Sequence, residues 1–84
     1  MEVSVLRHFL DTNFDALREH GMVMHTHEGE TINIRPYSIL DLCEDVGILY
    51  IVEFIRLHYH DGTDEVNNEH SVFVSTLESV SVRS

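Results

Sequence analysis

Two short stretches of the sequence carry residue types that bind metal ions. "HTHEGE" at 25–30 and "HYHDGT" at 58–63 each place two histidines one residue apart, followed by an acid and a glycine. Neutral imidazole is a common ligand for transition metals, and carboxylate oxygens complete many such sites. These two stretches are therefore the first places to look for chemistry.

The first stretch has the better geometry for a metal site. Its Glu-Gly pair lies between extended runs and predicts a two-residue hairpin turn. Such a turn would place His27 opposite Glu30 and His25 opposite Ile32. Because alternate residues of a strand share a face, two imidazoles and one carboxylate would gather on one side of the hairpin. The candidate ligands for a weakly bound divalent ion are His25, His27 and Glu30.

The alternative is that both histidine pairs mark exposed hairpin ends, with no cofactor bound. Ile32 and Ile34 continue the face of the first pair toward a core, and the sequence has no HExxH motif. It also lacks a phosphate-binding glycine loop and a GxSxG motif. The single cysteine, Cys43, lies in the apolar run "SILDLC" and is typical of a small core residue. We therefore expect a protein that is not an enzyme.

Charge is the clearest compositional feature. The chain has fifteen acids against five arginines and no lysine, giving a formal net charge of −10. Direct binding to DNA or RNA needs cations that replace the counterions around phosphates, so the composition excludes it. A negative surface instead favours a partner protein with a basic surface.

The acids gather in two places. One group lies in "DGTDEVNNE" and the other in a segment expected to be a short helix. Rows of carboxylates can imitate the charge of nucleic acid, and the alternative is that they only keep a small fold soluble. In size, acidity and lack of catalytic motifs the chain resembles phage-encoded inhibitors of restriction, repair or CRISPR enzymes. The candidate partner-binding residues are Asp61, Asp64, Glu65 and Glu69 in the first group, and Asp41, Glu44 and Asp45 in the second.

Length and apolar runs limit the organisation of the chain. Its 84 residues predict one small domain over 1–84. The lone cysteine argues for a reducing compartment, and "MEVSVLRHFLDTNF" does not read as a signal peptide. The longest apolar run, "VGILYIV", is well short of the roughly 20 residues that span a bilayer. We expect no membrane association and a cytoplasmic location, in a host cell if the protein is viral.

Periodicity predicts the elements that would position these residues. A first helix begins the chain and ends at Gly21, because glycine suits a left-handed C-terminal cap. A hairpin should follow over 22–35. A short helix is predicted at 37–46, with a strand through "YSILDL" as the alternative. The apolar stripe of the first helix is Leu6, Leu10, Phe14 and Leu17.

The second half reads as a second hairpin. A strand over 48–60 would extend about 43 Å, so it must bend or project its polar "HYH" end beyond the core. "DGTDEVNNE" is expected to be a loop, and 71–82 a last strand with a bulge near Ser75 and Thr76, where the alternation slips.

These elements predict an α+β domain. Its N-terminal helix would pack on a small, mostly antiparallel four-stranded sheet, with a short second helix between the two hairpins. The functional hypothesis is a non-enzymatic acidic protein that inhibits or assists a protein partner. The alternatives are a small metal-binding module that uses the HxH hairpins, and a self-assembling subunit, such as a homodimer, that pairs exposed strand edges.

Overall fold

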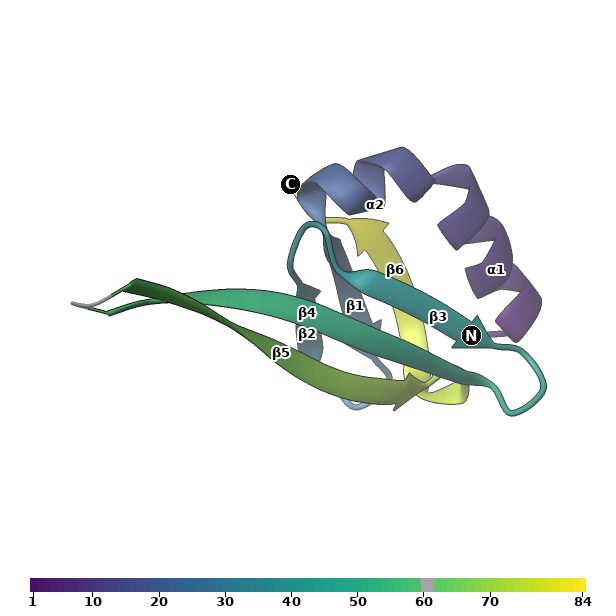
Figure 1. Cartoon of the computed structure of the whole chain (residues 1–84). Coiled ribbons are helices and arrows are strands. Elements are labelled where there is room, and N and C mark those ends of the chain that lie inside the picture. Colours follow the sequence, from purple (N-terminus) through teal and green to yellow (C-terminus); the bar gives the residue numbers. More distant parts are fainter. Residues whose placement is uncertain (60–61) are drawn as a thin grey trace.

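The fold is that of a computed structural model, shown in Figure 1. It describes the backbone of residues 1–59 and 62–84, and the side chains of these residues except at 57–59, 63 and 64. Over these ranges two α-helices, six strands and one 3-10 helix follow one another, which confirms the α+β class. In chain order they are α1 (Val3–Thr12), α2 (Phe14–His20), β1 (Met22–Thr26), β2 (Thr31–Ile34), β3 (Ile39–Cys43), β4 (Ile48–Tyr59), β5 (Gly62–Phe73), η1 (Val74–Thr76) and β6 (Leu77–Val82).

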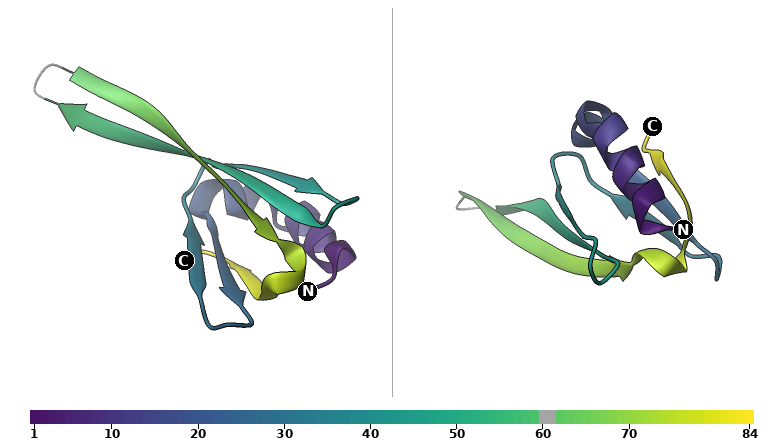
Figure 2. Two further views of the ribbon diagram at one scale, coloured as in Figure 1. Left: turned by 90° about the horizontal axis from the view of Figure 1, so that it is seen from below. Right: turned by 90° about the vertical axis from the view of Figure 1, so that its right-hand side faces the viewer.

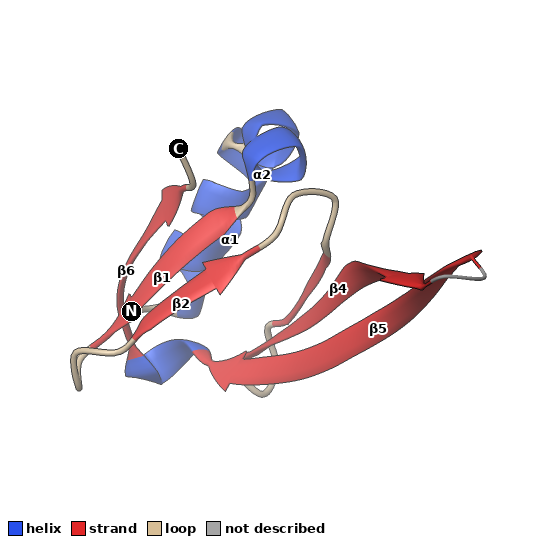
Figure 3. Cartoon of the chain, turned by 90° about the vertical axis from the view of Figure 1, so that its left-hand side faces the viewer, coloured by secondary structure: helices blue, strands red, loops and turns tan. Residues whose placement is uncertain are grey.

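The strands of the described ranges form two antiparallel three-stranded sheets, ordered β2-β1-β6 and β3-β4-β5. The expected four-stranded sheet was wrong because 71–82 is not one strand. Its alternation slips where expected, but η1 rather than a bulge divides the run. There the backbone N–H of buried Val74 donates to the Gly47 carbonyl at 2.9 Å, and the chain passes from one sheet into the other (Figure 3).

The first helix is broken at Asn13. The side-chain amide and backbone N–H of Asn13 both donate to the Phe9 carbonyl, at 2.9 and 3.0 Å. An Asn side chain that competes for a helix carbonyl favours such an end. Leu17 stays buried beyond the break, whereas Phe14 is 65% exposed. The predicted stripe was therefore right at three of its four positions and wrong at Phe14.

Residues 37–46, predicted to be a helix, contain strand β3 and the start of a turn. Leu40 and Leu42 face inward while Ile39 and Asp41 are exposed, the two-residue period of a strand. Pairing with β4, from Ile39 opposite Val52 to Cys43 opposite Ile48, satisfies the backbone that a helix would have bonded internally. Gly47, expected to follow the helix, instead has φ 68° in the β3–β4 turn.

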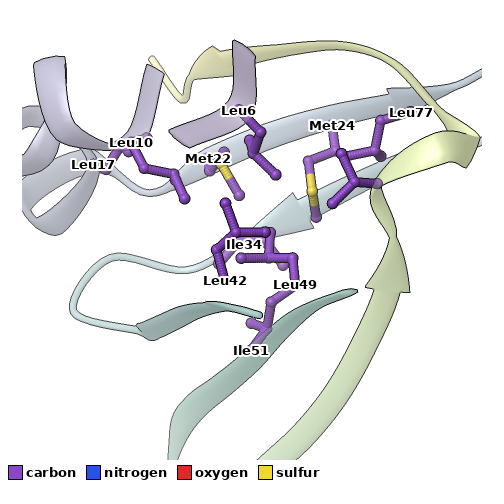
Figure 4. Packing of buried hydrophobic residues seen from close by; sticks show 11 residues of the cluster. Leu6, Leu10, Leu17, Met22, Met24, Ile34, Leu42, Leu49, Ile51 and Leu77 are labelled. Carbon is purple, nitrogen blue, oxygen red and sulfur yellow. The ribbon is translucent and has the colours of Figure 1, made fainter. Parts of the chain in front are cut away.

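One hydrophobic core lies between the two sheets and the helices (Figure 4). Leu6 reaches it from α1, Met24 from β1 and Leu49 from β4, and all three are fully buried. Each sheet is thus covered on one face only, with the helices closing one side of the space between them (Figure 3). This arrangement leaves the opposite face of β3-β4-β5 exposed.

Strands β4 and β5 extend beyond this core. They pair continuously from Ile48 opposite Phe73 to Tyr59 opposite Gly62, but β3 pairs with β4 only as far as Val52. The remainder, 53–59 with 62–68, projects as a two-stranded arm (Figures 1 and 2). The molecule therefore measures 46 × 25 × 24 Å. The expected projection of the long strand is confirmed, whereas most of the expected loop is strand β5.

Candidate partner-binding surface

The alternation along β4 determines which side chains face away from the core. Leu49, Ile51 and Glu53 are buried. Their neighbours Tyr50 and Phe54 point to the opposite side and are 45% and 42% exposed. Strand β4 thus holds two aromatic side chains outward, Tyr50 where it pairs on both sides and Phe54 where it pairs with β5.

The register places carboxylates on the same side as these aromatic rings. Asp41 on β3 is opposite Tyr50. On β5, Glu69 is opposite Val52 and Glu65 is opposite Arg56. Opposite residues of antiparallel strands lie on the same face. We call this surface the outer face; its residues are Ile39, Asp41, Cys43, Ile48, Tyr50, Val52, Phe54, Arg56, Glu65, Asn67, Glu69, Ser71 and Phe73.

The outer face therefore combines members of both acidic groups that the sequence separated. Three of the predicted partner-binding residues, Asp41, Glu65 and Glu69, belong to it. All three are exposed. The Arg56 guanidinium lies 3.2 Å from a Glu65 oxygen with both side chains largely exposed, so this ion pair adds little stability.

The other predicted acids lie elsewhere. Glu44 and Asp45 are in the β3–β4 turn, where Glu44 accepts a hydrogen bond from Arg7 Nε at 2.9 Å. Asp64 lies in β5 opposite Leu57, and its side chain is outside the described part of the chain. Asp61 is not among the described residues. The second acidic group was thus assigned to a helix that is a strand and a turn.

The predicted metal site does not have the expected geometry. The hairpin turn is longer than two residues: the Thr26 N–H donates to the Glu30 carbonyl at 3.0 Å, and His25 is opposite Thr31 rather than Ile32. His25 Nδ1 lies 3.2 Å from the Thr31 hydroxyl. His27 is beyond the end of β1, so it does not face Glu30 across a ladder. Within the described ranges no three His, Cys, Asp or Glu residues are placed to hold a metal ion.

The structure also shows a buried charged cluster that the sequence reading missed. Glu53, at the root of the arm, is 3% exposed. One of its oxygens accepts hydrogen bonds from the Arg35 backbone N–H and guanidinium, at 3.1 and 3.2 Å. The other lies 2.7 Å from His70 Nε2 on β5. An acid at an inward position of the apolar run "LYIVEFIRL" was the signal that could have found it.

These contacts keep the Glu53 carboxylate charged. Burial alone would raise its pKa, because desolvation disfavours the ionised form. The hydrogen bonds from the Arg35 backbone, from His70 and from the Arg35 side chain act in the opposite direction, and the net result is a lowered pKa. Glu53 therefore acts as an anionic link between the arm and the β2–β3 connection.

Comparison with known protein families, curated proteins and solved structures found no match to this chain. Neither helix in the described ranges is long and apolar enough to cross a membrane.

Proposed function

We propose that this chain is a non-enzymatic interaction protein that binds a partner protein through the outer face. The observation that supports the proposal most is the presence of exposed aromatic and acidic side chains together on a sheet face that no other element of the described chain covers. Aromatic side chains supply large apolar contact area and are enriched at protein interfaces. The carboxylates between them select a partner with basic groups at matching positions.

The spacing of these carboxylates bears on the kind of partner. Glu65 and Glu69 are four residues apart on β5, which is about 13 Å along a strand. B-DNA carries one charge per about 1.7 Å of its axis, so the described acids are a sparse imitation of a phosphate backbone. We therefore expect the partner to be recognised by aromatic contact and by charge together. A basic, nucleic-acid-binding protein remains the partner class that we propose, with an inhibitor or accessory factor as the role.

The test compares two variants with the same change in charge. The first is the triple variant Asp41→Asn, Glu65→Gln, Glu69→Gln on the outer face. The control is Glu19→Gln, Glu28→Gln, Glu78→Gln, which removes three exposed carboxylates from α2, the β1–β2 turn and β6. Partners are captured from a lysate of the source cells at low and at high salt.

We expect the outer-face variant to lose a salt-sensitive partner that the wild type and the control both retain. Because charges at an interface act mainly on association rate, the loss should be a slower association with a shallower salt dependence. Duplex DNA in excess should compete for the same partner if that partner binds nucleic acid. Equal capture by both variants would contradict a role for the outer face.

Aromatic contact is tested separately by Tyr50→Ala and Phe54→Ala. Both side chains are substantially exposed, so the fold should tolerate their removal. We expect each to weaken binding by a larger factor than any single carboxylate, since aromatic residues are frequent hot spots. Faster dissociation, measured by surface plasmon resonance with the captured partner, is the expected result.

A further inference from the structure

A cavity of about 460 Å³ opens between the helices and the β2–β3 connection, and among the described residues it shares only Ile39 with the outer face. This volume is within the range of small-molecule sites. The buried side chains of Leu10, Leu17, Met22 and Ile34 line it. A pocket lined in this way favours an apolar ligand.

The walls of the cavity are held by specific backbone contacts. Gly21, which ends α2 with φ 85°, lies so close to β2 that a Cβ atom there would collide with the Ile34 carbonyl. Across the opening, Tyr37 takes the left-handed φ of 61° and donates its backbone N–H to the Arg18 carbonyl at 2.8 Å. The Ser38 hydroxyl donates to the Arg35 carbonyl at 2.7 Å. The site is therefore formed before any ligand arrives.

The charged side chains that line the cavity are mostly cationic, whereas those of the whole protein are mostly acidic. Among the described residues, three of the chain's five arginines line it, whereas Asp11 is the acid that does so. Arg7 bonds Glu44 at 2.9 Å and Arg35 bonds Glu53 at 3.2 Å. The Arg18 guanidinium lies farther from its acidic partner than the other two do.

Arg18 is the arginine best placed to receive a ligand. Within the described part of the chain its one ion pair joins Nη2 to an Asp15 oxygen at 3.9 Å, with the side chains 53% and 86% exposed. Such a pair is weak in water. The planar guanidinium matches a carboxylate with two parallel hydrogen bonds, and a single carboxylate at the mouth would leave the apolar floor for a hydrocarbon chain.

We propose that this cavity binds an amphipathic monocarboxylate, with its aliphatic chain on the leucine and methionine floor and its carboxylate on Arg18. The proposal does not depend on the proposed function, because Arg18 and the buried floor are not part of the outer face, and Ile39, which borders both surfaces, is changed in none of the variants. Phe14 and Ile39, which are 65% and 54% exposed at the cavity, cover the chain of the ligand.

Three probes of equal chain length test both parts of this proposal: decanoate, 1-decanol and decyltrimethylammonium, each below its micelle-forming or solubility limit. Binding to the full chain is followed by ¹H–¹⁵N NMR. We expect decanoate to cause saturable shifts at the amides of Gly21, Tyr37 and Ser38. Decanol should bind about tenfold more weakly and the ammonium probe more weakly still.

Variants separate the headgroup from the chain. Arg18→Gln should weaken decanoate about tenfold and leave decanol unchanged, because a charge-assisted bond is lost. Arg56→Gln removes the same charge from the arm and should change neither. Phe14→Ala should weaken both probes. All three side chains are exposed enough for the fold to survive, which the spectra themselves report.

Several results would overturn the proposal. These are the absence of saturable shifts with decanoate, shifts confined to β4 and β5, and equal affinities for the three probes. An Arg18→Gln variant that binds decanoate as tightly as the wild type would also overturn it.

Discussion

The Glu53 carboxylate accepts two hydrogen bonds from Arg35, which is 18 residues earlier in the chain, at 3.1 Å from the backbone N–H and 3.2 Å from the guanidinium. The pair connects the root of the arm to the β2–β3 connection, and thereby one sheet to the other. Charged side chains are rarely buried unless they are paired. This relationship has direct consequences for stability.

Removing the Glu53 carboxylate should destabilise the protein. We expect Glu53→Ala to lower the free energy of unfolding by about 2 kcal/mol, because the partly buried Arg35 N–H loses its acceptor and a cavity is left where the buried side chain was. Glu53→Gln keeps one acceptor oxygen and should cost less. Urea denaturation measures both. Glu65→Gln, which breaks an exposed ion pair, is the control and should change stability by less than about 1 kcal/mol. An equal loss for Glu53→Ala and Glu65→Gln would contradict the role of burial.

The lowered pKa of Glu53 predicts how stability depends on pH. A carboxyl whose pKa is lower in the folded than in the unfolded state stabilises the fold fully above its unfolded value. That contribution shrinks as the pH falls below the ordinary value of 4.5 and is lost once the pH passes the lowered folded pKa.

The corresponding measurement is the difference in unfolding free energy between wild type and Glu53→Gln, followed from about pH 7 to about pH 3. The extra unfolding free energy of the wild type over Glu53→Gln should be constant at first and then decrease on acidification. A constant advantage over the whole interval would show that Glu53 does not titrate differently in the two states.

Gly21 and Gly29 allow steric collision to be separated from backbone strain. Both have positive φ, 85° and 91°, but a Cβ at Gly21 meets the Ile34 carbonyl whereas at Gly29 it meets open space. We expect Gly29→Ala to cost about 1 kcal/mol from its left-handed backbone. Gly21→Ala should cost at least twice as much, by thermal or urea unfolding. Equal costs would show that β2 yields to the added methyl group.

The break at Asn13 predicts unequal roles for two apolar residues of α2. Leu17 is 6% exposed and Phe14 is 65% exposed. Leu17→Ala should lose about 2–4 kcal/mol, as buried leucines do. Phe14→Ala should lose less than about 0.5 kcal/mol, since surface substitutions rarely cost more. A large loss at Phe14 would indicate that the helix is continuous in solution.

Local patterns predicted the parts of this fold that depend on neighbours in sequence. The buried positions of Leu6, Leu10 and Leu17 follow from helical spacing, and Gly21 follows from the chemistry of helix ends. Residues 37–46 were predicted to be a helix, with a strand through "YSILDL" as the alternative. Pairing with β4 decided between them, and that pairing is a tertiary contact which propensity does not contain.

The outer face also could not be predicted from local patterns, because it depends on tertiary strand pairing. Acidity alone indicated a partner-binding role, but nothing local indicated that Asp41 would share a face with Glu69. That depends on the registers of β3 and β5 against β4. The histidine hairpin shows how sensitive such arguments are to register, because a one-residue change alters every opposite pair.

The connection through η1 also affects the order in which the chain can fold. β4 and β5 are consecutive and can join as a hairpin within about 1–10 μs. In contrast, β1 pairs with β6, and most of the chain lies between their paired residues Met22 and Val82. Closing so long a loop makes that pairing slow. We expect the β4–β5 hairpin to form first and the β1–β6 pairing to be rate-limiting. The aromatic rings of β4 are then accessible to other molecules before the core is closed.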